Sequence, residues 1–146
     1  MKTLLKTLHF VGLSLFLGSI VAYIVAGAVA ESREALAFSR NFVLAGTLYV
    51  TIPAMWVVGL TGMVMSGLPR TAWQKAKGIG FVLVALNTHI FIFPAIRESV
   101  DFLRIGNQAM FEHAAMTEAV AGLVNILLIL ALIVTGVNKR LFLASR

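Results

Sequence analysis

The sequence contains no cysteine, and only 12% of its 146 residues are charged. Without cysteine there is no disulfide framework, no thiolate metal site, no C-x-x-C-H haem attachment and no cysteine nucleophile. Soluble domains carry about 25% charged and about 45–50% apolar residues, whereas 60% of this chain is apolar. The composition therefore excludes an ordinary soluble domain, and its apolar character excludes disorder.

Four long stretches of the chain contain no charged residue: 7–30, 41–69, 78–96 and 119–138. Each reaches or exceeds the roughly 18–20 residues that a helix needs to cross about 30 Å of hydrocarbon. Because lipid offers backbone groups no hydrogen-bond partner, each span is expected to be a helix. We predict an all-α polytopic membrane protein, a single domain over 1–146 with spans near 4–30, 44–66, 78–96 and 118–138.

Two features of the first two spans need an explanation if both are membrane helices: a start that resembles a signal peptide, and an internal proline. The basic start and the sequence Ala28-Val29-Ala30 resemble a signal peptide. The apolar segment is about 24 residues long, against 7–15 for a signal peptide, which favours a retained first helix. Pro53 lies inside the second span and is expected to kink it, with Thr51 and neighbouring helices accommodating the freed carbonyl.

The distribution of Lys and Arg predicts how the spans are oriented. Eight basic and no acidic residues lie at the N-terminus, in 67–77 and at the C-terminus: Lys2, Lys6, Arg70, Lys75, Lys77, Lys139, Arg140 and Arg146. The segments 31–40 and 97–118 carry four arginines and all six acids. The positive-inside rule therefore places both termini in the cytoplasm. The net charge of +6 then indicates contact with anionic lipid rather than nucleic acid.

Connections of this kind predict a four-helix up-down bundle. Loop 31–40 is short, so the first two helices are expected to be antiparallel neighbours. Loop 97–118 is long for a structureless connection, and its apolar residues suggest a short interfacial helix. We find no internal repeat and no second domain. A stripe of small residues at four-residue spacing would let another helix approach closely, and it also permits a homo-oligomer: Ser14, Gly18, Ala22, Ala26 and Ala30.

Two histidines lie inside the predicted spans. His9 is near the cytoplasmic end of the first, and His89 is about eleven residues into the third. Ionisable groups at membrane depth are costly and usually functional, but a histidine can also be structural and bond a carbonyl across the bundle. Lys75 and Lys77 open the third span, where snorkelling lysines are common. By helical arithmetic, His89 aligns better with Lys75 than with Lys77.

Other kinds of chemistry have no signal in the sequence. There is no Gly-rich phosphate loop and no nucleophile with a nearby base, so hydrolase and kinase functions are excluded. All six acids are expected outside the membrane, which argues against a proton relay built on buried carboxylates.

The first span reads LKTLHFVGLSLFLGS, and the third opens with WQKAK. The segments FIFPAIRES and PAMWVVGLTGMVMSG are also distinctive. Together they resemble a superfamily of small four-helix membrane proteins. It includes the HemJ-type protoporphyrinogen oxidases, the CopD-type copper-resistance proteins and related uncharacterised bacterial membrane families. The resemblance implies a b-type haem bound with His9 and Lys77, where Trp73 marks the motif. The HemJ-type pattern places a histidine about eleven residues after that lysine, and here His89 is twelve after it.

Our leading hypothesis is therefore a haem-b-binding membrane protein with a redox role. Neutral imidazole is a common axial ligand of haem iron, and His9 is the best candidate. His89, Lys77 or no residue is the second ligand. Arg70, Lys75 and Lys77 could pair with the haem propionates. A porphyrin or a quinone-like molecule is the expected partner besides the bilayer, and no catalytic residue or substrate follows from the sequence.

Two alternative functions stay open besides haem binding. Met110, His113 and Met116 are spaced i, i+3, i+6, and on a helix they would share one broad face. Thioethers with imidazole suit Cu(I), which would indicate copper handling. The plainer interpretation of these three residues is a helix resting on the membrane surface. The second alternative is a scaffold subunit with no chemistry of its own.

Overall fold

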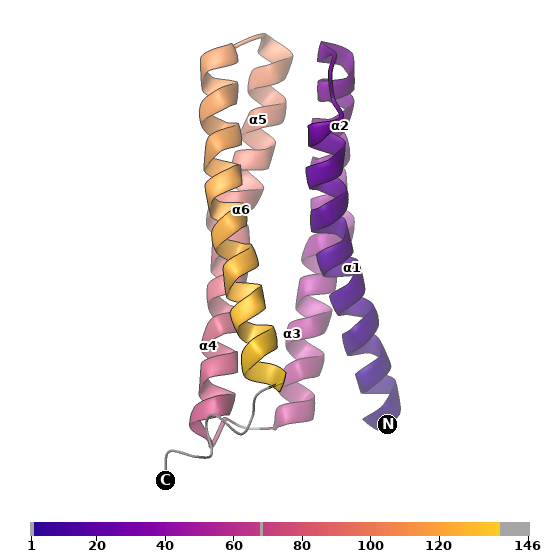
Figure 1. Ribbon diagram of the computed structural model, residues 1–146, viewed down its shortest axis with the longest axis vertical. Helices are drawn as coiled ribbons and strands as arrows, with labels where there is room; N and C mark the ends of the chain where they lie inside the picture. Colours follow the sequence, from indigo (N-terminus) through magenta and orange to yellow (C-terminus); the bar gives the residue numbers. More distant parts are fainter. Residues whose placement is uncertain (1, 68, 138–146) are drawn as a thin grey trace.

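The computed structural model describes residues 2–67 and 69–137. Helices account for every regular element in these residues: α1 (Lys2–Ala28), α2 (Arg33–Gly46), η1 (Thr47–Thr51), α3 (Ile52–Ser66), α4 (Ala72–Asn87), η2 (Thr88–Ile92), α5 (Phe93–Ile105) and α6 (Gln108–Val137). α2, η1 and α3 form one continuous helix, as do α4, η2 and α5. Figure 1 shows the resulting four long helices side by side. All four are long and apolar enough to cross a membrane, which confirms the number of spans predicted for this part of the chain.

The two middle helices extend further than the charge-free runs. α2 begins at Arg33 because Ser32 caps it, its hydroxyl accepting a hydrogen bond from the Ala35 amide at 3.1 Å. α5 continues to Ile105 and ends at Gly106, whose φ of +73° glycine adopts without strain. α6 starts directly after the turn. The expected loops 31–40 and 97–118 were therefore wrong for most of their length, because polar sequence outside the hydrocarbon still continues the helices.

Each middle helix contains a π-helical turn just before a proline. The amides of Ile52 and Phe93 donate to the carbonyls five residues earlier. The extra residue in each turn makes room for the rings of Pro53 and Pro94, which would clash with a regular helix. The Thr51 hydroxyl donates to the Gly46 carbonyl at 3.4 Å, which is seven residues before Pro53 and is not the carbonyl that the proline frees. The pattern Thr-x-x-x-x-(Ile/Phe)-Pro-Ala occurs in both helices, a short repeat contrary to our expectation of none.

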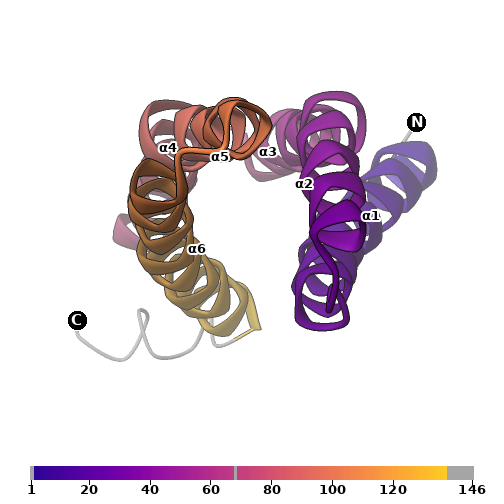
Figure 2. The same cartoon turned by 90° about the horizontal axis from the view of Figure 1, so that it is seen from above.

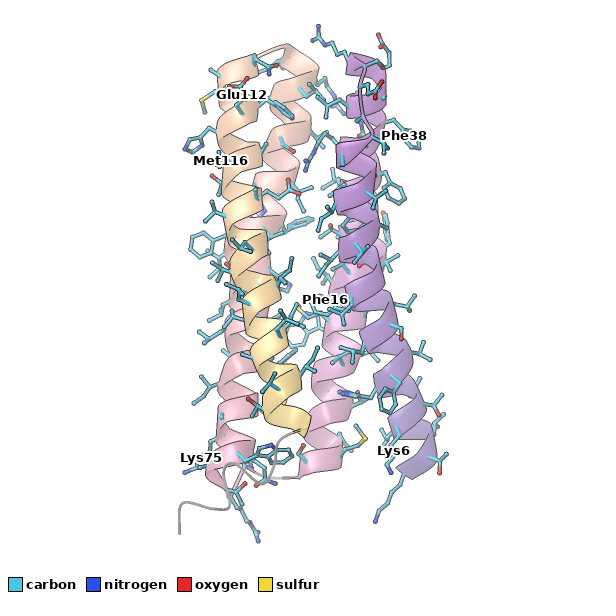
Figure 3. The ribbon with its side chains drawn as sticks, viewed as in Figure 1. Lys6, Phe16, Phe38, Lys75, Glu112 and Met116 are labelled. Atoms are coloured by element: carbon cyan, nitrogen blue, oxygen red, sulfur yellow. The ribbon has the colours of Figure 1, made fainter. Side chains whose placement is uncertain are left out.

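The four helices leave one side of the arrangement open (Figure 2). α1 packs against α2, η1 and α3, whereas α6 packs against α4, η2 and α5. α2 packs against α5, but α1 and α6 are not among the closely packed pairs. A central cluster joins α1, α3, α4 and α6: Phe16, Ala54, Met55, Val84, Ala85 and Ile129. Figure 3 shows Phe16 pointing between the helices, at the level of this cluster.

Only part of the predicted small-residue stripe of α1 packs against the other helices of this chain. Ser14, Gly18 and Ala22 are exposed, and no described atom lies within 4 Å of a Cβ built on Gly18. Gly59 on α3 does serve close packing, since a Cβ there would lie 2.1 Å from Phe81 Cζ. These three residues of the stripe therefore face away from the other helices of this chain, whereas Gly59 is where α3 admits a large side chain of α4.

Candidate functional site

His9 lies on the face of α1 that packs against α3. Its Nδ1 is 3.1 Å from the Val58 carbonyl oxygen and 3.0 Å from the Thr61 hydroxyl. The Thr61 hydroxyl donates to the Val57 carbonyl at 2.6 Å, so its oxygen is left to accept from His9. Both neighbours of Nδ1 are then acceptors, which places the imidazole proton on Nδ1 and a lone pair on Nε2. Among the described residues, none forms a hydrogen bond with Nε2.

Lys77 lies near His9 although the two residues are far apart in sequence. The Lys77 ammonium is close enough for its charge to act on His9. It lies 4.9 Å from the centre of the Trp73 ring, a distance at which a cation and an aromatic face attract. Trp73 donates from Nε1 to the Thr135 carbonyl at 2.6 Å and so joins α4 to α6. The three residues that the family resemblance implied thus lie toward one end of the molecule, His9 against α3 and Lys77 beside Trp73 on α4.

The other predicted haem residues lie in two different places. Arg70 and Lys75 are exposed at the end of the molecule that also carries Lys6, which we call the lysine end (Figure 3). His89 is exposed on η2, where its Nδ1 lies 2.8 Å from the Ala85 carbonyl and its ring packs edge-on against Trp56. His89 is twelve residues beyond Lys77 along one helix, about 18 Å. The structure therefore does not bring His89 to His9, and these two histidines are not placed to share one iron.

A hydrogen-bonded network joins η2 and α4 to α6 deeper in the molecule. The Asn125 side chain, only 3% exposed, donates to the Thr88 hydroxyl at 3.0 Å. Asn87 donates to Asn125 Oδ1 at 3.2 Å and to the Ala121 carbonyl at 2.8 Å. The two fully buried side chains of this network, Thr88 and Asn125, both have protein partners, so the role of the network is to fix α6 against its neighbours.

We expect Asn125→Leu to destabilise the protein by about 1 kcal/mol, because interhelical hydrogen bonds in membranes contribute about that much. The free energy of unfolding, obtained by titrating the detergent-solubilised protein with sodium dodecyl sulfate, measures the loss. Asn41→Leu is the control, since Asn41 is exposed and bonds only the Ala37 carbonyl of its own helix. Equal stabilities of the two variants would contradict the structural role of the network.

Arg40 and Glu118 form an ion pair across the molecule, between α2 and α6. Their side chains are only 12% and 20% exposed. We expected both residues in external loops and all acids outside the membrane. The expectation of loops was wrong for both residues, because Arg40 lies in α2 and Glu118 lies in α6. The charge pattern carried a partial signal, since each residue directly borders a charge-free run. Nothing in the sequence indicates that these two residues, 78 positions apart, would meet.

A cavity of about 390 Å³ lies beside this ion pair. α1, α2, η1, η2, α5 and α6 contribute its walls. The walls are mainly apolar, and the polar side chains among them are Tyr23, Arg40, Thr47, Thr51, Thr88, Glu118 and Asn125. His9 is not one of the lining residues, so the cavity and the His9 site are distinct.

The three residues of the copper alternative lie on α6, which is helical from Gln108 onward. Met110, His113 and Met116 are all exposed there. Figure 3 shows Met116 at the end opposite to the lysine end, together with Glu112. In the described residues, no group of three or more His, Cys, Asp or Glu side chains could hold a metal ion. Any metal chemistry in this part of the chain would thus involve single histidines, methionine sulfur or a prosthetic group.

Comparisons with protein-family models, with curated proteins and with solved structures find no match for this chain. The resemblance to the HemJ- and CopD-type superfamily therefore rests on the short motifs alone.

Proposed function

We propose that this chain is a bacterial inner-membrane protein that binds haem b through His9 and has a redox role. In this proposal the helices run up and down across the bilayer, with the lysine end and both termini in the cytoplasm. The excess of Lys and Arg at the lysine end supports this orientation. The protein resembles protoporphyrinogen oxidases of the HemJ type only in its motifs, so its substrate and electron acceptor are left open.

The observation that carries the proposal is the state of the His9 ring. Histidines that ligate metals almost always donate their other ring N–H to a carbonyl or carboxylate, which fixes the tautomer and the ring orientation. His9 has this arrangement, with Nδ1 held by Val58 and Thr61 and Nε2 without a described protein partner. Gly62 lies beside the ring, and a Cβ there would be 3.4 Å from His9 Cε1. That position lies on the Cε1–Nδ1 side of the ring, so a side chain at 62 would press on the part of the imidazole that is held by Val58 and Thr61.

Other residues at the same end of the molecule as His9 suit the remaining parts of a bound haem. A bound haem would supply one-electron chemistry, which the side chains of this protein do not provide themselves. Lys77, Arg70 and Lys75 lie on α4 or directly before it, at the same end of the molecule as His9, where they could pair with propionates. With His89 remote, Lys77 or no residue is the second ligand.

The test is the visible spectrum of the protein purified in detergent after reconstitution with haemin. We expect a Soret band that His9→Ala abolishes and that the control His89→Ala leaves unchanged, because His89 does not approach His9. A wild-type protein that stays colourless would contradict the proposal and favour the scaffold alternative. Complementation of a strain that lacks protoporphyrinogen oxidase then tests the enzymatic role separately.

Copper handling is the second candidate, and one observation favours it. The stretch with Met110, His113 and Met116 is helical, so the three side chains share one exposed face. We expect Cu(I) binding, measured by competition with a chromogenic chelator, to weaken at least tenfold when both methionines are replaced by leucine. The control is Met63→Leu, which removes an exposed methionine on another helix. Unchanged affinity in the double variant would exclude this site.

A further inference from the structure

The cavity beside the Arg40–Glu118 pair lies at the open side of the helices, which faces the bilayer if they span it as we propose. It is bounded on one side by α1 and on the other by α6, the two helices that do not pack closely together. Figure 2 shows the open side of the arrangement between them. Gly27 of α1 and Gly122 of α6 line the cavity, and a Cβ on either would meet no described atom within 4 Å. A molecule dissolved in the membrane can therefore enter without separating packed helices.

The dimensions of the cavity select a narrow ligand. Along the chain its lining runs from Arg40 to Thr51 on one wall and from Ala115 to Ile126 on the opposite wall. Each stretch corresponds to a depth of about 16 Å in a helix. A volume of about 390 Å³ over such a depth leaves a section suited to one hydrocarbon chain or a single flat ring.

Two donors in the wall lack protein partners. Arg40 Nε is buried, and no described residue accepts a hydrogen bond from it. The Thr47 side chain lines the cavity in a residue only 2% exposed, and its hydroxyl likewise bonds no described residue. Arg40 Nε itself is enclosed beyond the reach of a molecule in the cavity, although the Arg40 side chain lines the wall. The Thr47 hydroxyl is therefore the donor for which a ligand would supply an acceptor, and the Arg40 guanidinium is the second polar group of this wall.

The spacing of the two donors points to a ligand with two acceptors. Arg40 and Thr47 are seven residues apart, which places them on one helix face about 10 Å apart along the axis. Two hydrogen bonds of about 2.9 Å, joined by a ring with carbonyl oxygens at opposite ends, span a similar length. An acyl ester has its carbonyl at one end of the chain only and would leave the Thr47 hydroxyl without a partner.

The charge of the site selects a neutral ligand. Glu118 already compensates the Arg40 guanidinium, so a carboxylate or phosphate would meet an occupied cation and a nearby anion. We propose that this cavity binds a para-quinone with a hydrocarbon tail, its two carbonyl oxygens accepting from Arg40 and Thr47 and its tail leaving between α1 and α6. This site is separate from His9, and the proposal does not require that haem be bound.

The experiment uses the full chain in phosphatidylcholine nanodiscs with decylubiquinone as the probe. Quinone retained by captured nanodiscs is extracted and quantified by ultraviolet absorbance, and uptake by empty nanodiscs is subtracted. We expect saturation at one quinone per chain. Gly27→Leu and Gly122→Leu should each weaken binding at least tenfold by filling the cavity. Gly18→Leu, at an equally open glycine outside the cavity, is the matched control and should leave binding unchanged.

Thr47→Val keeps the shape of the side chain and removes one donor, so we expect about fivefold weaker binding from the loss of one hydrogen bond. Uptake no greater than in empty nanodiscs overturns the proposal, as does equal weakening in Gly18→Leu. A quinone affinity unchanged in Thr47→Val, with monodecanoyl glycerol competing for the site, would assign it to lipid chains instead. The same titration on His9→Ala separates the two proposals, because that variant should bind quinone normally.

Discussion

Replacing Arg40 by methionine should destabilise this protein by about 3 kcal/mol, since breaking a buried ion pair leaves the other charge without compensation. Glu118, with a side chain only 20% exposed, would then face α2 without a counter-charge. Titration with sodium dodecyl sulfate gives the free energy of unfolding, and thermal unfolding in detergent provides a second measure. This is the largest single effect that we expect in the described residues.

Two further variants test whether the loss of stability in Arg40→Met comes from breaking the ion pair. Arg97→Met removes an arginine that is exposed on α5, and it should change stability by less than about 0.5 kcal/mol. The double variant Arg40→Met with Glu118→Leu should recover most of the loss, because apolar pairs often replace buried ion pairs without cost. If Arg40→Met is as stable as Arg97→Met, the pair does not hold α2 and α6 together.

Gly59→Ala should cost about 1–3 kcal/mol, the usual penalty for overfilling a packed contact. The new Cβ would lie 2.1 Å from Phe81 Cζ, so the ring or the helix must move. The ring is held on its other side by Trp56, with the two centroids 5.7 Å apart. The same unfolding titration measures the loss.

A second substitution tests this cause directly. Phe81→Leu in the Gly59→Ala background shortens the obstructing side chain and should restore part of the stability. Gly18→Ala is the matched control and should cost nothing, because no described atom lies near its Cβ position. A loss in Gly18→Ala equal to that in Gly59→Ala would mean that glycine matters for the helix itself rather than for Phe81.

Residue spacing along a helix predicted one part of the candidate site and not another. The motifs pointed to His9 and Lys77, and the structure places them within electrostatic range. The arithmetic also showed that one face of a helix cannot present Lys77 and His89 to a single point. What it could not give was the rotation of each helix about its axis, which leaves His89 exposed beside Trp56. That rotation depends on how whole helix faces fit together.

The number of helices long and apolar enough to cross a membrane was determined by the sequence itself, because an uninterrupted apolar run has no other stable form in lipid. The sequence also contained the cap at Ser32 and the glycine that ends α5, although the change in composition at the membrane border obscured both. Only the tertiary structure decided that Arg40 meets Glu118, that α1 and α6 stay apart, and that a cavity lies between them. Such contacts join residues distant along the chain, and they depend on side-chain shapes across several helices rather than on any local pattern.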